Sequence, residues 1–309
     1  MIRVENLTKY YGKRLAVDNI SFNIDKGEIV GLLGPNGAGK TTTMRILTGF
    51  LMPTDGECWI AGHNVINDSL ESRRHIGYLP EQVPLYTDMT VRGYLDYLAR
   101  LRNYSKTNIK TRVDDVIDIC HLQEYADVFI SKLSKGFRQR VGVAQAIVHE
   151  PDVLILDEPT VGIDPIQVTQ TRQLIKQLGK DHTVILSTHI LPEVSTICKR
   201  VIIINEGKIV AEDNIENLSS LISGTNRLRL EIKGVSSRVL EVLNKIRGVT
   251  KASFYDTYYI IEYPAKIDLR SQISEAVTKG GFTLLSMQTE TLSLEDIFIR
   301  LTKDQESKN

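Results

Sequence analysis

Apolar and polar positions along the first 218 residues predict strands and helices in alternation. Three runs, residues 153–156, 183–186 and 201–204, are apolar at every position except Thr183. Runs of this length are typical of strands buried on both faces, as in a parallel sheet covered by helices. Two further strands are expected at residues 2–7 and 16–24, where apolar residues recur at short spacing. The pattern therefore predicts an α/β domain.

Between about residues 90 and 148 the spacing becomes that of a helix. Apolar residues recur three or four positions apart, and Thr90 precedes them as a suitable N-cap. The recurring residues are Val91, Tyr94, Leu95, Leu98 and Leu101. This block predicts a helical subdomain inserted into the α/β domain.

The composition of residues 217–226 predicts a linker to a second unit at 227–309. The unit shows the order β-α-β-β-α-β, which suggests a ferredoxin-like sandwich. Its strands are expected near 228–232, 249–254, 258–263 and 282–287, with helices at 239–246 and 268–279. Ser293 and Asp296 form a capping box for a last amphipathic helix through Leu301. No cluster of catalytic residue types is visible in this unit.

Composition and charge narrow the class of protein. The 309 residues include 38 basic and 38 acidic side chains, so no net charge favours nucleic acid or an anionic membrane. No apolar run approaches the ~20 residues needed to span a bilayer, and the first residues lack the layout of a signal peptide. We therefore expect the chain to stay in the cytosol. The three cysteines are far apart and are expected to be buried free thiols.

Residues 34–41 carry the most specific motif of the chain, since they match G-x-x-x-x-G-K-[ST] at every fixed position. An apolar strand run at 28–33 enters this loop and a helix-like run at 42–47 leaves it. The glycines allow a tight turn that points backbone N–H groups at phosphates bound at the positive end of the helix. Lys40 would approach the β- and γ-phosphates, and the Thr41 hydroxyl would bind Mg²⁺. The expected nucleotide-binding residues are Gly34, Pro35, Asn36, Gly37, Ala38, Gly39, Lys40, Thr41 and Thr42.

Two adjacent carboxylates end the apolar run at 153–156. The end of a buried strand rarely tolerates two acids without a cation or a catalytic task. Asp157 suits the coordination shell of Mg²⁺, and Glu158 suits the general base that polarises an attacking water.

Upstream of this strand, residues 133–140 read LSKGFRQR before an apolar helix, and this segment resembles the LSGGQ signature of ABC-transporter ATP-binding subunits. The resemblance covers residues 1 to about 218 and implies that two chains pair head to tail around two ATP molecules. In that arrangement Ser134, Lys135 and Gly136 would face the γ-phosphate bound by the opposite subunit. A helix N-terminus is physically suited to this role.

The same resemblance assigns roles to three further residues. Tyr11 lies where the family places an aromatic ring that stacks on adenine, and stacking suits such a ring. His189 matches the switch histidine that contacts the γ-phosphate, and with Glu158 and Lys40 it completes the catalytic set. Asp164 matches the loop that crosses the dimer interface. The other five histidines are expected to be surface or packing residues.

The chain departs from the commonest family pattern in two places. Lys135 stands where the signature usually has glycine, and we expect this added cation to strengthen ATP capture by the opposite subunit. Glu81 stands where the family usually has its Mg²⁺-contacting glutamine, with Gln82 one residue later. A carboxylate can also bind Mg²⁺. The alignment with the family motif makes Glu81 the preferred metal ligand and Gln82 the alternative. Both departures also occur in the bacterial ABC-2-type export branch, which this chain most resembles.

The resemblance implies an ATP-hydrolysing subunit of an export transporter, a P-loop α/β domain with a small accessory domain. It would act as a homodimer or heterodimer with ATP and Mg²⁺, at the cytoplasmic face of the membrane through a separate permease. That permease would contact residues 81–90 and the helical block. The alternative is a soluble ABC ATPase acting on nucleic acid or ribosomes, although no charge pattern favours nucleic acid. A regulatory module without hydrolysis is disfavoured by Lys40, Asp157, Glu158 and His189.

Overall fold

The computed structural model describes residues 1–309 except 103–107, 216, 218–224, 235, 265–266 and 291–309. The chain divides into two compact units, Met1–Asp213 and Asn214–Asn309. Each unit has its own buried core. Among the described residues, no helix is long and apolar enough to cross a membrane.

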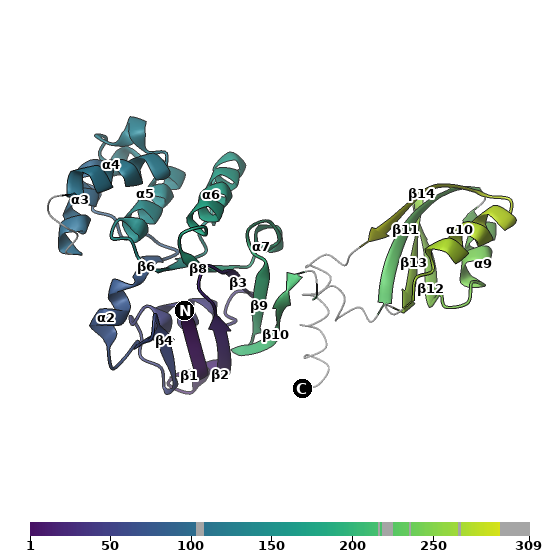
Figure 1. Ribbon diagram of the computed structural model, residues 1–309, viewed down its shortest axis with the longest axis horizontal. Coiled ribbons are helices and arrows are strands. Elements are labelled where there is room, and N and C mark those ends of the chain that lie inside the picture. Colours follow the sequence, from purple (N-terminus) through teal and green to yellow (C-terminus); the bar gives the residue numbers. More distant parts are fainter. Residues whose placement is uncertain (103–107, 216, 218–224, 235, 265–266, 291–309) are drawn as a thin grey trace. The chain divides into compact units, whose positions relative to one another are not determined.

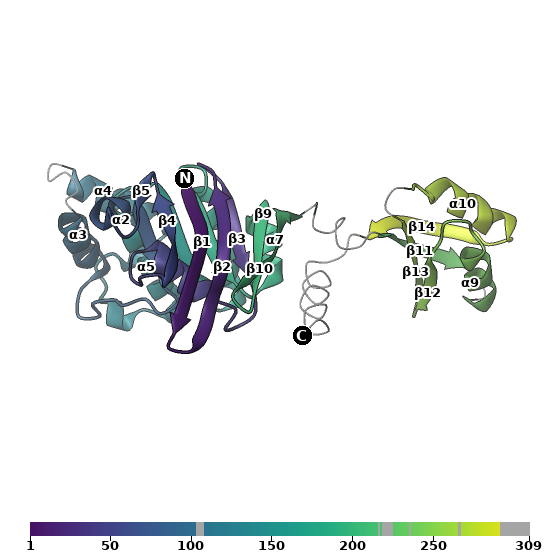
Figure 2. The same ribbon diagram turned by 90° about the horizontal axis from the view of Figure 1, so that it is seen from below.

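The first unit begins with an antiparallel sheet of four strands in the order β2-β1-β4-β5. Alternate residues of the two long strands face the core, Val4 and Phe22 among them, and the residues between them face outward. The strands are β1 (Ile2–Tyr11), β2 (Arg14–Ile24), β4 (Asp55–Ile60) and β5 (His63–Asn64). Figure 2 shows β1 and β2 lying side by side as a long ribbon.

A second sheet of six strands, in the order β10-β9-β3-β8-β7-β6, positions the chemistry. The pairs β9–β3, β3–β8, β8–β7 and β7–β6 are all parallel. The strands are β3 (Ile29–Leu33), β6 (Ile76–Leu79), β7 (Val153–Asp157), β8 (Thr183–Thr188), β9 (Arg200–Asn205) and β10 (Lys208–Asn214). Parallel strands end at one edge, so the loops after β3, β6, β7 and β8 meet there, where ligands bind in open α/β sheets.

Helices cover the second sheet and form the separate block seen at the upper left of Figure 1. The helices of the α/β part are α1 (Lys40–Leu47), α2 (Ser69–Arg74), α6 (Pro165–Leu178) and α7 (Leu191–Ile197). The block contains α3 (Val91–Leu101), α4 (Ile109–Ile119), α5 (Lys135–Ile147) and two short 3₁₀ turns, Gln123–Tyr125 and Ile130–Lys132. Thr90 caps α3 as predicted, since its hydroxyl accepts from the Gly93 N–H at 3.2 Å.

The second unit has the predicted element order, with the antiparallel strand order β12-β13-β11-β14. Its first and last strands are therefore neighbours, which is the ferredoxin-like arrangement and confirms that prediction. The elements are β11 (Thr225–Lys233), α9 (Ser236–Asn244), β12 (Lys251–Tyr255), β13 (Tyr258–Pro264), α10 (Arg270–Lys279) and β14 (Thr283–Glu290).

Two predictions need comment. The linker was expected to reach residue 226, but β11 begins at Thr225, because Thr225 and Asn226 pair with Pro264 and Tyr263 across the sheet. Local composition does not reveal such a long-range pairing. The expected last helix from Ser293 to Leu301 lies outside the described residues.

The prediction of buried free thiols is confirmed for all three cysteines, Cys58, Cys120 and Cys198. Burial raises the pKa of Cys58 and of Cys120 to about 12, so neither thiol is reactive at neutral pH.

Candidate functional site

A cavity of about 490 Å³ lies at the edge of the six-stranded sheet where the parallel strands end. It brings together most of the residues that the sequence marked as catalytic or nucleotide-binding. The lining residues are Tyr11, Arg14, Ala16, Asn36, Gly37, Gly39, Lys40, Thr41, Thr42, Glu81, Glu158, Val161 and His189. Segments separated by more than a hundred residues of sequence therefore form one pocket.

The loop between β3 and α1 has the geometry that its glycines predict. Gly37 and Gly39 have φ of 83° and 109°, a region that residues with a Cβ rarely adopt. A Cβ on Gly34 would lie 2.3 Å from the Ile204 carbonyl oxygen, so this position has no room for a side chain. The first turn of α1 holds no acidic residue, and Lys40, Thr41 and Thr42 at its N-terminus line the cavity. This end of the helix suits an anion.

Lys40 is held inside the loop with its charge aimed at the cavity. Its side chain is only 5% exposed, and its ammonium donates to the carbonyls of Gly34 at 2.7 Å and Pro35 at 3.2 Å. The same nitrogen lies 3.4 Å from Oε1 of Glu158. A buried cation beside three oxygens has a fixed position, which suits a phosphate contact.

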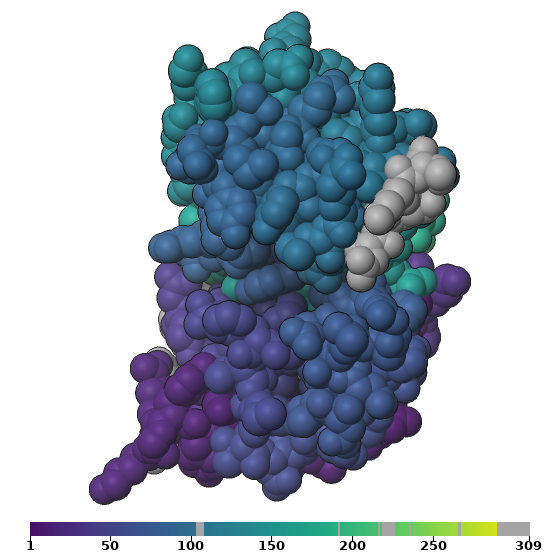
Figure 3. All heavy atoms as spheres, turned by 90° about the vertical axis from the view of Figure 1, so that its left-hand side faces the viewer, coloured from purple at the N-terminus to yellow at the C-terminus, as the bar shows by residue number. Residues whose placement is uncertain are grey.

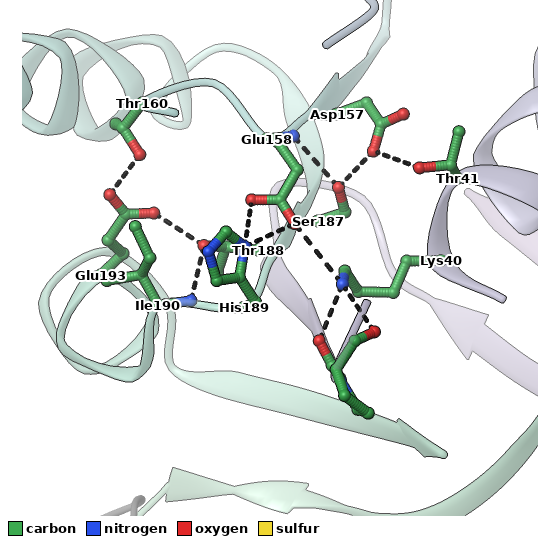
Figure 4. A network of polar contacts seen from close by, with 12 residues as sticks. Lys40, Thr41, Asp157, Glu158, Thr160, Ser187, Thr188, His189, Ile190 and Glu193 are labelled. Atoms are coloured by element: carbon green, nitrogen blue, oxygen red, sulfur yellow. Dashed lines mark hydrogen bonds and ion pairs between the residues drawn. The ribbon is translucent and has the colours of Figure 1, made fainter. Parts of the chain in front are cut away.

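Asp157, the last residue of β7, is 1% exposed. Its Oδ1 accepts from the Ser187 hydroxyl at 2.5 Å and the Thr41 hydroxyl at 3.3 Å (Figure 4). Its Oδ2 is buried and has no hydrogen-bond partner. An unpaired buried carboxylate oxygen is costly unless a cation binds it, so this donor set fits a divalent metal.

Glu158 follows directly and turns its side chain toward Lys40 and His189. Its φ of 48° lies in the left-handed region, and its N–H is fixed by the hydroxyl and the carbonyl of Ser187 at 3.1 and 3.2 Å. The carboxylate is 7% exposed and lies 3.0–3.1 Å from Nδ1 of His189. Strained backbone of this kind is common at functional sites, where surrounding contacts maintain it.

The structure separates the two candidates for the metal ligand after β6. Glu81 lines the same cavity as Thr41, whereas Gln82 lines a neighbouring cavity of about 270 Å³ that Glu81 also borders. Glu81 and Thr41 therefore border one cavity, and Gln82 borders another.

The signature segment lies outside the cavity of its own subunit. Ser134 caps α5, with its hydroxyl accepting from the Phe137 N–H at 3.4 Å, so the local prediction of an N-cap is confirmed. The Lys135 ammonium approaches Gly162 closely enough that a Cβ there would lie 2.1 Å from it. Asp164 caps α6 through the N–H groups of Ile166 and Gln167.

Sequence reasoning missed three functional neighbours. Arg14 and Val161 line the cavity, and Ser187 orients both Asp157 and the backbone of Glu158. The signal for Ser187 is a hydroxyl at the end of the apolar run 183–186, where an apolar residue would be expected. Tyr11 lines the cavity and is 46% exposed.

Comparisons with known proteins agree with this geometry. Residues 17–161 match the family model described as "ABC transporter". The chain is 35% identical to the bacitracin transport ATP-binding protein BcrA of Bacillus licheniformis, over 97% of both chains. It is 32% identical to the linearmycin resistance ATP-binding protein LnrL of Bacillus subtilis (strain 168), over 98% of both. It is also 31% identical to the Nod factor export ATP-binding protein I of Ralstonia nicotianae, over 98% of this chain and 94% of that one.

Among solved structures, the fold resembles an ATP-binding subunit of an ABC transporter with a TM-score of 0.66 and 28% identity, over 72% of this chain and 93% of that one. It also resembles the dimeric post-hydrolysis state of the ATP-binding cassette MJ0796 bound to ADP and Pi, with a TM-score of 0.64 and 27% identity. That match covers 70% of this chain and 99% of the cassette.

Proposed function

The chain belongs to the ABC transporter family as an ATP-binding, ATP-hydrolysing subunit of an export-type system, and we propose how its residues perform that work. Adenine stacks on the exposed ring of Tyr11, at the mouth of the cavity. The phosphates lie on the loop at 34–41 and at the N-terminus of α1, where Lys40 neutralises the β- and γ-phosphates.

Thr41, Asp157 and Glu81 would hold Mg²⁺ together with the phosphates. The buried, unpaired Oδ2 of Asp157 supports this assignment. A Mg²⁺ ion held by these residues would supply positive charge that offsets the negative charge developing on the phosphates.

Glu158 acts as the general base that orients and polarises the attacking water, and His189 contacts the γ-phosphate. The contact between Glu158 and His189, at 3.0–3.1 Å, beside Lys40 in a single cavity, is the observation that carries this proposal. It places a carboxylate, an imidazole and an ammonium around one position for the reacting phosphate.

Two subunits would pair head to tail, so that Ser134, Lys135 and Gly136 of one face the γ-phosphate held by the other. Two observations support a contribution of the signature segment to the ATP site of the opposite subunit. The segment lies outside the cavity of its own subunit, and the related cassette MJ0796 is a dimer. Asp164, at the start of α6, would lie at the interface. Residues 1–218 would form the ATP-binding domain, and residues 227–309 would form an accessory domain.

A separate permease would carry the cargo across the membrane and bind the chain peripherally at its cytoplasmic face. Exposed aromatic side chains support a docking surface formed by residues 81–90 and the helical block, where Tyr86 before α3 and Tyr97 on α3 are 54% and 40% exposed and their rings lie 5.9 Å apart. Figure 3 shows this block above the N-terminal part of the first unit. The three relatives are 31–35% identical to this chain and are named for different cargoes. This supports selection of the cargo by the permease.

Nucleotide-dependent dimerisation tests the proposal. Glu158→Gln should slow hydrolysis, and sedimentation with MgATP should then show a dimer that is absent without nucleotide. Ser134→Arg in the same background should bind ATP and remain monomeric, because it fills the contact with the opposite phosphate. Ser274→Arg, on the exposed face of α10, is the matched control and should still dimerise. A dimer that persists with Ser134→Arg would contradict the proposed arrangement.

The membrane partner is tested by purifying the full chain from detergent-solubilised membranes of its native host. Recovery with a membrane-spanning protein supports a transporter. Recovery with ribosomes or nucleic acid alone would instead support the soluble ATPase.

A further inference from the structure

Glu193 is a completely buried carboxylate beside the catalytic residues, on the short helix α7 that follows β8. It does not line the nucleotide cavity, so it has no direct contact with substrate. Removing a carboxylate from water is costly unless several donors compensate. The donors that surround the Glu193 carboxylate therefore indicate its role.

On one side Glu193 holds the loop that follows Glu158. Its Oε1 accepts a hydrogen bond from the Thr160 hydroxyl (Figure 4). The same oxygen lies 3.5 Å from Nη2 of Arg172 on α6. Thr160 lies in the segment that joins Glu158 to Asp164, the N-cap of α6. This side of the carboxylate therefore holds the loop that connects the general base, Glu158, with Asp164 at the expected dimer interface.

On the other side Glu193 holds the turn that carries His189. Its Oε2 accepts from the Thr188 hydroxyl at 2.8 Å, and the same hydroxyl accepts from the Ile190 N–H at 3.0 Å. A threonine hydroxyl has one hydrogen, so donation to Glu193 leaves its lone pairs facing Ile190. Both residues that flank His189 are thereby fixed to one carboxylate.

We propose that Glu193 is a positioning residue that keeps His189 against Glu158 and joins this contact to the loop leading to Asp164. The inference rests on the proposed roles of Glu158 and His189 and adds the group that sets their geometry. His189 itself is 42% exposed, and among the described residues Glu158 is the side chain with which its ring makes a polar contact. Without the network its ring would turn freely toward solvent.

Glu193→Gln tests this in the full chain, because it keeps the shape and removes the acceptor-only character that orients both hydroxyls. We expect kcat for ATP hydrolysis to fall by about 10- to 100-fold, since misplacement of a catalytic group by about 1 Å costs on the order of 100-fold. The KM for ATP should change little, because the phosphate loop is untouched. Thr188→Val should reproduce the loss of kcat, and Thr188→Ser, which keeps the hydroxyl, should not.

Glu212→Gln is the matched control. Glu212 also pairs with an arginine, since its Oε1 lies 2.6 Å from Nη1 of Arg200, but Glu212 is on β10 and does not line the cavity. Glu212→Gln should leave kcat unchanged. Thermal unfolding of Glu212→Gln and Glu193→Gln shows how far each variant is destabilised. A fall in kcat as large as that of Glu193→Gln would indicate a general loss of stability and overturn the proposal. If Glu193→Gln does not fold, the Thr188 pair decides the question alone.

A double-mutant cycle with His189→Ala separates positioning from an independent effect. In the His189→Ala background, Glu193→Gln should change kcat by less than about two-fold, because the group it positions is gone. If the fold loss in kcat of the double variant equals the product of the losses of the two single variants, the inference is overturned. Unchanged turnover in Glu158→Gln and His189→Ala themselves would instead reject the proposed catalytic roles, so the two failures are distinguishable.

Discussion

Replacing Glu158 by glutamine removes the charge of the general base while keeping nearly the same shape. The amide oxygen still accepts from Lys40, and the amide nitrogen cannot accept a proton from water at neutral pH. Because Asp157, Thr41 and the phosphate loop are unaltered, nucleotide and metal binding should persist. The substitution therefore separates chemistry from binding.

The magnitude follows from two contributions. Loss of a general base costs about 10²- to 10⁴-fold in rate, or about 3–5 kcal/mol in the activation free energy. The Lys40–Glu158 pair at 3.4 Å corresponds to about 5 kcal/mol of Coulomb attraction at an effective dielectric constant of about 20. Desolvation of both groups offsets most of this, so the free energy of unfolding should fall by only about 1–3 kcal/mol.

The assay is phosphate release at saturating MgATP, combined with ATP affinity by equilibrium fluorescence and with urea unfolding. We expect kcat to fall by at least about 100-fold while the Kd for ATP is unchanged or lower, because a negative charge near the phosphates is removed. Glu212→Gln, which loses a carboxylate elsewhere in the same unit, should retain full turnover. A fall of less than about ten-fold in Glu158→Gln would refute the assignment of the general base.

Three further predictions concern the loop, the metal and a buried histidine. Gly34→Ala places a Cβ against the Ile204 carbonyl, so calorimetry and ATP titration should show about 1–3 kcal/mol lower stability and weaker binding. Thr41→Ala removes the hydroxyl beside Asp157, and the Mg²⁺ concentration for half-maximal turnover should rise while metal-free ATP binding changes little. Burial lowers the pKa of His149 to about 4 in the folded chain. As pH falls below 6.5, this histidine is therefore protonated in the unfolded chain before it is protonated in the folded one, and the folded state loses stability. Relative to His149→Gln, the parent should lose up to about 3 kcal/mol of stability between pH 6.5 and 4, and equal pH profiles in urea unfolding would contradict this.

The strands of the six-stranded sheet are readable from the sequence because burial on both faces requires continuous apolar runs. The runs at 153–156 and 183–186 become β7 and β8, each entirely buried. The start of β11 is not readable in this way. Its first residues are polar and join the sheet only because β13 lies opposite them.

The backbone of the loop at 34–41 was predictable for a similar reason, since Gly37 and Gly39 have angles that few residues other than glycine adopt. Ser187 and Glu193 were not predictable. A serine at the end of a strand and a glutamate in a short helix are ordinary in sequence, and their importance arises from partners about 30 residues away, such as Asp157 and Thr160.

The amino-acid sequence by itself determined which segments form strands and helices, where phosphate can bind, and which acids follow a buried strand. These properties depend on local sterics and on the burial of individual side chains. Only the tertiary structure decided that Glu81 faces the cavity, that Glu158 contacts both Lys40 and His189, and that one buried carboxylate joins two loops. Distances between segments far apart in the chain depend on how the sheet is assembled, and no local pattern records them.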